Sequence, residues 1–98
     1  MYIEINGITY RVKFFTEGNM TFAELYKVEV DGILTQAFID GVAILHPNDH
    51  FEKAKGRKVA LADLLENLEG ILWAISNYRL TKNERTLIWE EYFKTFKK

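Results

Sequence analysis

The amino-acid sequence predicts an α+β fold, in which a four-stranded antiparallel meander is followed by two, or three, helices packed on one face. Alternating apolar and polar residues flank Asn6-Gly7, which is the strongest short signal for a β-hairpin. Asp31-Gly32 predicts a second turn. After residue 50 the apolar residues recur every three or four positions, the spacing of a helix face. We therefore expect a single domain over 1–98, with the sheet at about 1–46 and the helical layer at about 48–97.

Four segments of the first half are expected to be strands, namely YIEI, ITYRVKFF, MTFAELYKVEV and ILTQAFIDGVAIL. Gly41 lies inside the fourth segment and predicts a bulge or bend there. Because the first turn has two residues, apolar side chains of both flanking strands fall on one face. That face carries Ile3, Ile5, Ile8, Tyr10, Val12 and Phe14.

The aromatic side chains of the sheet have two interpretations. Tyr10, Phe14, Tyr26 and Phe38 alternate with polar residues, so they suit packing under the helices better than a platform for stacking nucleic-acid bases. The opposite face is then polar and of mixed charge, and it is a candidate surface for docking a protein. It is expected to carry Thr9, Arg11, Lys13, Lys27 and Glu29.

The first helix is expected directly after Pro47, which cannot donate to a strand ladder but suits a helix start. Asn48 or Asp49 is the predicted N-cap. From Phe51 the helical spacing either continues unbroken or is interrupted at Gly70. We expect a break or kink at Gly70, because the apolar residues that follow it turn a second face.

The last helix is predicted to begin after Thr81. The segment Thr81-Lys82-Asn83-Glu84 fits a capping box, in which the threonine hydroxyl accepts from the Glu84 N–H and the Glu84 carboxylate reaches back. One broad apolar stripe follows on this helix, formed by Ile88, Trp89, Tyr92, Phe93 and Phe96.

Composition limits the classes of function. The net charge is −1, whereas a domain that coats DNA normally carries a large basic excess. The chain has no cysteine, which excludes disulfides, zinc–thiolate sites and cysteine catalysis. No apolar run approaches the roughly 18 residues of a membrane span, and the alternating N-terminal segment is unlike a signal peptide. We expect a cytoplasmic protein that needs no membrane and no cofactor.

The most distinctive candidate site is the basic run EKAKGRK at residues 52–58. Its bases would spread over about half the circumference of a helix start, whose positive end attracts anions. Gly56 costs roughly 1 kcal/mol against alanine inside a helix, so it requires a packing or contact reason. A solvated helix face and a phosphate contact both fit this pattern. The candidate binding residues are Lys53, Lys55, Arg57 and Lys58.

A metal site is a weaker candidate in the segment before the run. His46 and His50 have the spacing of paired helical ligands, but Pro47 pushes residue 46 into an extended conformation. The glutamate of an HExxH motif is also missing between them. We expect no metal site, and no nucleophile or phosphate-loop motif indicates an enzyme. His46, Asp49 and Arg85 are retained as secondary candidates for binding.

Three segments, HPNDHFEKAKGRKVAL, LYKVEVDG and LTKNERTLIWEEY, together resemble a set of small, largely uncharacterised proteins encoded by bacteriophages and prophages. That set has the pattern HPxDxFxxxxGRKxAL, a short connector and an RxxIWxxY helix. The connector of this chain, LADLLENLEGILWAISNYR, is longer than the usual one. The matched positions are His46, Pro47, Asp49, Phe51, Gly56, Arg57, Lys58, Ala60, Leu61, Arg85, Ile88, Trp89 and Tyr92.

The resemblance implies a phage accessory protein that works inside a bacterial host by binding. We expect it to inhibit a host system, with an anti-CRISPR-like or other anti-defence inhibitor as the sharpest form of this hypothesis. Its partner would be a host protein or nucleoprotein complex, occluded sterically or electrostatically. The alternative is a nucleic-acid or nucleotide binder whose basic helix start meets phosphates. A small hydrolase is a third hypothesis, and the oligomeric state is left open.

Overall fold

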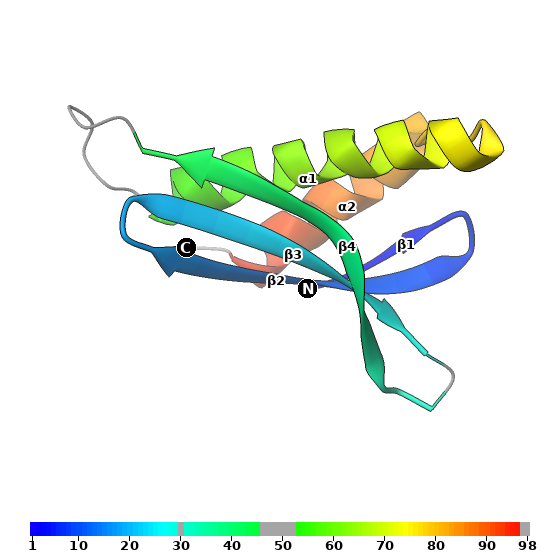
Figure 1. The fold of residues 1–98 in the computed structure, drawn as a ribbon, viewed down its shortest axis with the longest axis horizontal. Helices are drawn as coiled ribbons and strands as arrows, with labels where there is room; N and C mark the ends of the chain where they lie inside the picture. The colour runs from blue at the N-terminus through cyan, green and yellow to red at the C-terminus, as the bar shows by residue number, and fades with distance from the viewer. Residues whose placement is uncertain (30, 46–52, 97–98) are drawn as a thin grey trace.

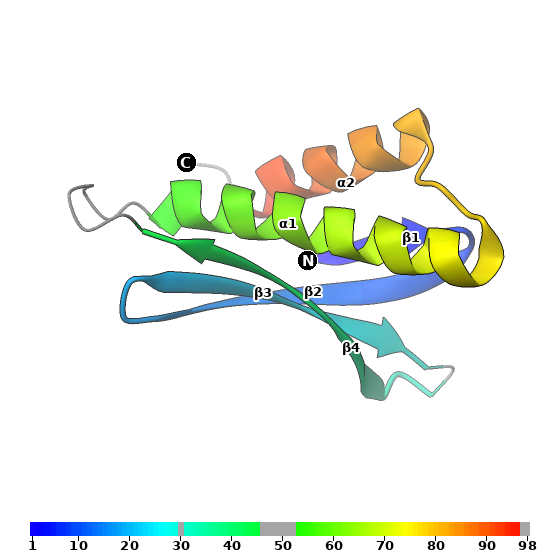
Figure 2. The same cartoon turned by 45° about the horizontal axis from the view of Figure 1, so that its top comes forward.

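The computed structural model describes residues 1–29, 31–45 and 53–96, with the backbone alone at 36–38. Its sheet has the order β1-β2-β3-β4, with neighbouring strands antiparallel. Two helices follow, and both lie on one side of the sheet (Figures 1 and 2). The predicted α+β meander is therefore confirmed. The elements are β1 (Tyr2–Ile5), β2 (Ile8–Glu17), β3 (Met20–Val28), β4 (Leu34–Ile44), α1 (Lys53–Ser76) and α2 (Lys82–Thr95).

The first hairpin has arms of unequal length. Asn6 and Gly7 have φ values of 52° and 78°, as the predicted two-residue turn requires. β1 pairs with β2 only from Ile8 to Arg11, and Met1 extends the pairing by one residue through hydrogen bonds with Val12. Among the described residues, no strand lies beside β2 beyond that point on this side. Half of β2 is therefore a free sheet edge.

The core lies between the sheet and the two helices. α1 packs on β3 and β4, and α2 packs on β1. Gly41 of β4 pairs regularly with Ala23, so the expected bulge does not lie at Gly41 itself. The irregularity lies next to it in the same strand, where β4 runs from Asp40 to Gln36 opposite Glu24 and Tyr26 of β3. A Cβ atom on Gly41 would collide with the backbone of Ala60 and Leu64. Glycine is needed there because helix and strand approach closely.

The inward face of β3 differs from the prediction. Ala23 and Leu25 are fully buried under the helices, and Tyr26 therefore lies on the outer face, because neighbouring strand residues point to opposite sides. Lys27 pairs with Tyr10 and belongs to the helix-facing side, where an outward position was expected. Small side chains face inward here because α1 packs so close to the sheet. The side chain of Phe38 lies outside the described residues.

α1 continues through Gly70 to Ser76, so the expected break is wrong. Gly70 is exposed, and a Cβ atom there would meet nothing within 4 Å. Leu64, Leu65 and Leu68, which precede the glycine, are buried in the core, and Leu72, which follows it, packs against the same core. The helix ends instead at Asn77, whose φ is 54°, a left-handed residue that often terminates helices.

α2 begins as predicted. The Thr81 hydroxyl accepts a hydrogen bond from the Glu84 N–H at 3.0 Å, and the Glu84 carboxylate accepts from the Thr81 N–H at 2.9 Å. The apolar stripe is narrower than expected, because Ile88 and Tyr92 are buried whereas Phe93 is half exposed.

Candidate anion-binding hollow

A hollow of about 470 Å³ lies between the free half of β2, the start of α1 and the end of α2. We call it the basic hollow. Its floor is apolar, with the rings of Phe14 and Phe96 packed edge to face at 5.4 Å. Thr16 and Thr21 add hydroxyl groups to its wall. Lys53 and Arg57 of α1 are among its lining residues, and Arg11 and Lys13 of β2 line it from the sheet edge, with their side chains on the outer face over the Tyr2 and Tyr26 rings.

The aromatic cluster at the end of α2 fixes the walls of the basic hollow. Tyr92 is buried, and its hydroxyl donates to the carbonyl oxygen of Ala54 at 3.3 Å. The rings of Phe14 and Tyr92 meet edge to face with 6.0 Å between centroids. These contacts tie the first turn of α1 to the last turns of α2 and to β2.

Arg57 is the best-defined cation of the site. Its Cζ atom lies 4.3 Å from the centroid of the Phe96 ring, a geometry that stabilises a guanidinium without neutralising it. Its Nε atom is buried and makes no hydrogen bond to any described residue. Buried donors normally have an acceptor, and none of the described residues supplies one here.

The basic run of α1 is divided by the helix geometry. Lys53 and Arg57 are four residues apart and share the face that lines the basic hollow. Lys55 lies two residues from each of them, on the opposite side of the helix. The Nζ atom of Lys58 lies 5.4 Å from the centroid of the Phe93 ring, outside the lining. The structure therefore brings together two of the four predicted bases.

Gly56 has a packing reason rather than a ligand-contact reason. A Cβ atom at this position would collide with the Thr21 hydroxyl of β3. The glycine lets the start of α1 lie close to the sheet, which sets the depth of the basic hollow. The expectation that Gly56 opens a direct approach for a phosphate is not supported by this geometry.

The free edge of β2 beside Arg11 and Lys13 is the feature that sequence analysis missed, whereas the two side chains lie on the outer face that alternation predicts. The Arg11 guanidinium lies 5.5 Å from the Tyr2 ring, and its Nε atom is buried without a partner in the described part of the chain. Lys13 lies 4.9 Å from the Tyr26 ring. The unequal lengths of YIEI and ITYRVKFF were the signal, since they leave part of the second strand unpaired.

The N-terminal amine of Met1 lies at the basic hollow, and its surroundings change its pKa. It donates to the Val12 carbonyl oxygen at 3.1 Å. Burial lowers the pKa of the Met1 amine below its ordinary value of 8.0, the Arg11 charge lowers the pKa further, and Glu91 acts in the opposite direction. Burial is the larger of the two causes, and both disfavour the protonated form of the amine.

No carboxylate lines the basic hollow within the described ranges. Guanidinium and ammonium groups beside two threonine hydroxyls suit a carboxylate or a phosphate, because both accept several charge-assisted hydrogen bonds. The partly enclosed, aromatic floor reduces the screening of such contacts by water. The chemistry of the site is therefore that of anion binding.

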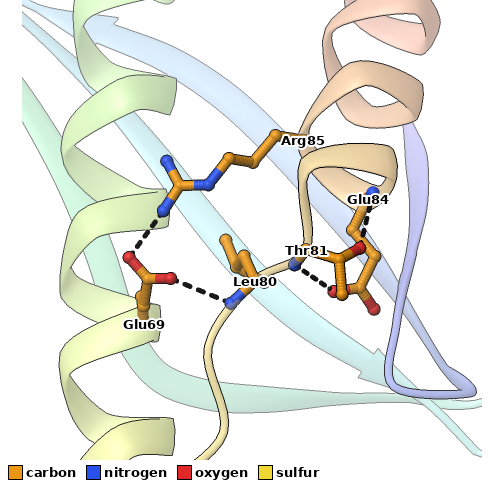
Figure 3. Close-up of polar contacts among 5 residues, drawn as sticks. All are labelled: Glu69, Leu80, Thr81, Glu84 and Arg85. Atoms are coloured by element: carbon orange, nitrogen blue, oxygen red, sulfur yellow. Dashed lines mark hydrogen bonds and ion pairs between the residues drawn. The ribbon is translucent and has the colours of Figure 1, made fainter.

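Arg85 lies elsewhere, at the opposite end of the helix pair. Its guanidinium binds the Glu69 carboxylate at 2.6 Å, and the other oxygen of Glu69 accepts from the Leu80 N–H at 2.8 Å (Figure 3). Burial alone would raise the pKa of Glu69, but the hydrogen bonds from Arg85 and Leu80 lower it below the ordinary 4.5. Arg85 has an intramolecular role that does not support its predicted role in binding.

Glu84 connects the same end of the molecule to the first hairpin. Its carboxylate accepts from the Asn6 N–H at 2.7 Å and from the Tyr78 hydroxyl at 2.7 Å, besides capping α2. Burial would raise the pKa of Glu84, but the hydrogen bonds from Thr81, Asn6 and Tyr78 lower it. We call Glu69, Glu84 and Arg85 the acidic clasp.

His46 and Asp49 lie outside the described residues, as do His50 and Glu52 of the rejected metal hypothesis. In the part of the chain that the structure describes, no group of three or more metal-ligating side chains comes together. No helix there has both the length and the apolar character needed to cross a membrane. No family model, curated protein or solved structure matches the chain.

Proposed function

We propose that this chain is a non-catalytic binding protein that grips a negatively charged group of a larger partner in the basic hollow. One observation carries the proposal: Lys53 and Arg57 share one face of α1 at a hollow whose described lining has no carboxylate, and Arg11 and Lys13 lie at its β2 edge. Like charges brought together raise the free energy of the free protein. An anion that enters the hollow relieves this repulsion and accepts charge-assisted hydrogen bonds from the Lys53 and Arg57 side chains.

The resemblance to phage-encoded proteins supplies the setting of the proposal. In that setting the partner is a bacterial host protein or nucleoprotein complex in the cytoplasm, and occlusion of an anionic surface would inhibit it. An anti-CRISPR-like inhibitor of a defence nuclease is the most specific form. The small size of the domain and its rigid, charged hollow support binding as the mode of action.

Direct binding of nucleic acid or a nucleotide is the second candidate. The same cations suit phosphates, and the partly exposed ring of Phe15, stacked on Phe22 next to this edge of β2, could also stack a base. The net charge of −1 favours a local contact over a long electrostatic track. The two candidates differ in salt response, because each phosphate contact releases counterions and steepens the loss of affinity with salt.

The primary test measures tripolyphosphate binding by calorimetry at low salt, with wild type compared with Lys53→Gln/Arg57→Gln. We expect the double variant to lose at least about tenfold in affinity, because two direct contacts disappear. The control variant Lys27→Gln/Lys55→Gln removes the same charge from positions outside the lining of the hollow. We expect its affinity for tripolyphosphate to fall by less than about threefold. Equal losses in both double variants would show general attraction and would contradict a site in the hollow.

The host partner is tested by a pull-down from bacterial cells, with bound protein and nucleic acid both identified. Wild type should retain a partner that the Lys53→Gln/Arg57→Gln variant loses and the Lys27→Gln/Lys55→Gln variant keeps. Reconstituted activity of that partner should fall when wild type is added. Retention of nucleic acid alone, with the steep salt dependence of phosphate contacts, would favour the second candidate.

A further inference from the structure

The two edges of the sheet are finished differently. On the β4 edge, side chains of α1 form hydrogen bonds with two backbone groups of the strand. Asp63 accepts from the Val42 N–H at 3.0 Å, and Asn67 donates to the Asp40 carbonyl oxygen at 2.9 Å. Such covering protects an edge strand from pairing with another chain. On the opposite edge, β1 and Met1 cover β2 only as far as Val12.

The free part of β2 presents unused backbone groups. Met1 exchanges two backbone hydrogen bonds with Val12, at 2.8 and 3.1 Å, so the N–H and C=O of Val12 point to this edge. By strand alternation, those of Phe14 and Thr16 point the same way. No described residue pairs with them. Lys13 and Phe15 instead direct their backbone groups toward β3, opposite Glu24 and Phe22.

The free edge and the basic hollow are one surface. Phe14 and Thr16 both line the hollow, and Lys53 and Arg57 lie across it on α1. An added antiparallel strand in line with β1 would place alternate side chains on the helix-facing side, opposite Phe14 and Thr16. An acidic side chain opposite Thr16 would then enter the hollow.

From this juxtaposition we propose that the partner contributes an extended acidic polypeptide segment, which adds to β2 as a strand and places its carboxylates in the basic hollow. The inference rests on the proposed function and names the partner class. Backbone pairing with Phe14 and Thr16 supplies affinity, while Lys53 and Arg57 select acidic residues at alternate positions. Charge complementarity argues for a carboxylate-bearing strand, because the described lining contains cations and no acid.

The test uses a fluorescent peptide of alternating glutamate and valine, and its binding is followed by anisotropy. The same peptide N-methylated at its glutamates keeps the charge but loses the strand N–H groups. We expect N-methylation to weaken binding at least about tenfold. Hydrogen exchange of the wild-type protein should show the Phe14 and Thr16 amides becoming protected on binding, whereas the Phe15 amide is already protected by β3.

A pair of protein variants tests the same edge. Thr16→Pro removes the outward N–H without removing a hydrogen bond to β3, and Thr16→Val keeps that N–H while removing the hydroxyl. We expect the proline variant to lose about tenfold in affinity and the valine variant less than about threefold. Circular dichroism checks that both variants fold. If the proline variant does not fold, the peptide and exchange measurements on wild type still test strand addition.

The outcomes separate the two proposals. Equal binding of both peptides, with unprotected Phe14 and Thr16 amides, would overturn strand addition and leave anion binding in the hollow intact. Tighter binding of an oligothymidylate of equal charge, unaffected by Thr16→Pro, would also overturn it and indicate nucleic acid. Binding of every anion unchanged in Lys53→Gln/Arg57→Gln would refute the proposed function itself.

Discussion

At one end of the helix pair, Glu69 and Glu84 are fully engaged by Arg85, Leu80, Thr81 and other donors of the same chain. At the other end, Lys53 and Arg57 face the basic hollow, where no carboxylate belongs to the described lining. The first arrangement uses charge to close the fold. The second leaves charge that no carboxylate of the described lining neutralises, and a bound anion would relieve the repulsion.

Two arginines show what this difference teaches. Arg57 and Arg85 both lie on helices and both were candidates for binding. Arg85 meets an acid of its own chain at 2.6 Å, whereas Arg57 meets the ring of Phe96 and keeps an unpartnered Nε within the described structure. Residue type and helix position are alike, so the neighbours supplied by the fold decide which arginine can bind a partner.

The largest effect on stability is expected at the acidic clasp. Glu84→Ala removes the cap of α2 and leaves the Asn6 N–H and Tyr78 hydroxyl without their acceptor. We expect the free energy of unfolding to fall by about 2 kcal/mol, measured by urea denaturation. Glu90→Ala, at an exposed position of the same helix, is the matched control and should change it by less than about 0.5 kcal/mol. Equal effects of the two substitutions would show that the clasp does not hold the fold.

The clasp also predicts how stability depends on pH. The folded-state pKa values of Glu69 and Glu84 lie below 4.5, so their stabilisation is fully present above that pH and is lost as pH falls through the folded values. We expect the melting temperature of wild type to drop more steeply below about pH 4.5 than that of Glu69→Gln/Glu84→Gln. Parallel curves for the two proteins would mean that other carboxylates cause the acid sensitivity.

The smallest effect on stability is expected at the basic end. Lys53→Gln/Arg57→Gln loses the contact of Arg57 with Phe96 but relieves repulsion, so the free energy of unfolding should change by less than about 1 kcal/mol. Tripolyphosphate should raise the melting temperature of wild type more than that of this variant, since a ligand of the native state stabilises it. A loss of unfolding free energy as large as that of Glu84→Ala would mean that these cations stabilise the fold. The two ends of the helix pair would then not differ in the role of their charges.

Much of the fold could be predicted from local signals. Asn6-Gly7 fixed the first hairpin because both turn residues must adopt positive φ, and Thr81 with Glu84 fixed the start of α2. Gly41 and Gly70 were misjudged for one reason. A glycine's role depends on what lies beside it, and Gly41 has helix backbone against it while Gly70 has open space.

The site was predicted only in part. Lys53 and Arg57 came from the basic run, but Lys55 points away, and the free edge of β2 that completes the hollow was not predicted. Strand alternation predicts on which face of the sheet a side chain lies. It does not predict which part of a strand forms an unpaired edge. Because the hollow forms where β1 stops short of β2, its walls come from β2, α1 and α2, which no local pattern connects.

By itself the sequence determined the order of strands and helices, the first turn, the cap of α2 and the presence of a dense cationic segment. These depend on the φ preferences, hydrogen-bonding groups and periodicity of neighbouring residues. Tertiary structure alone decided which charges are paired, because Glu69 and Arg85, or Arg57 and Phe96, are brought together by packing of the helices on the sheet. Whether a cation is paired with an acid depends on the distance between the two groups, and only the packed fold sets that distance.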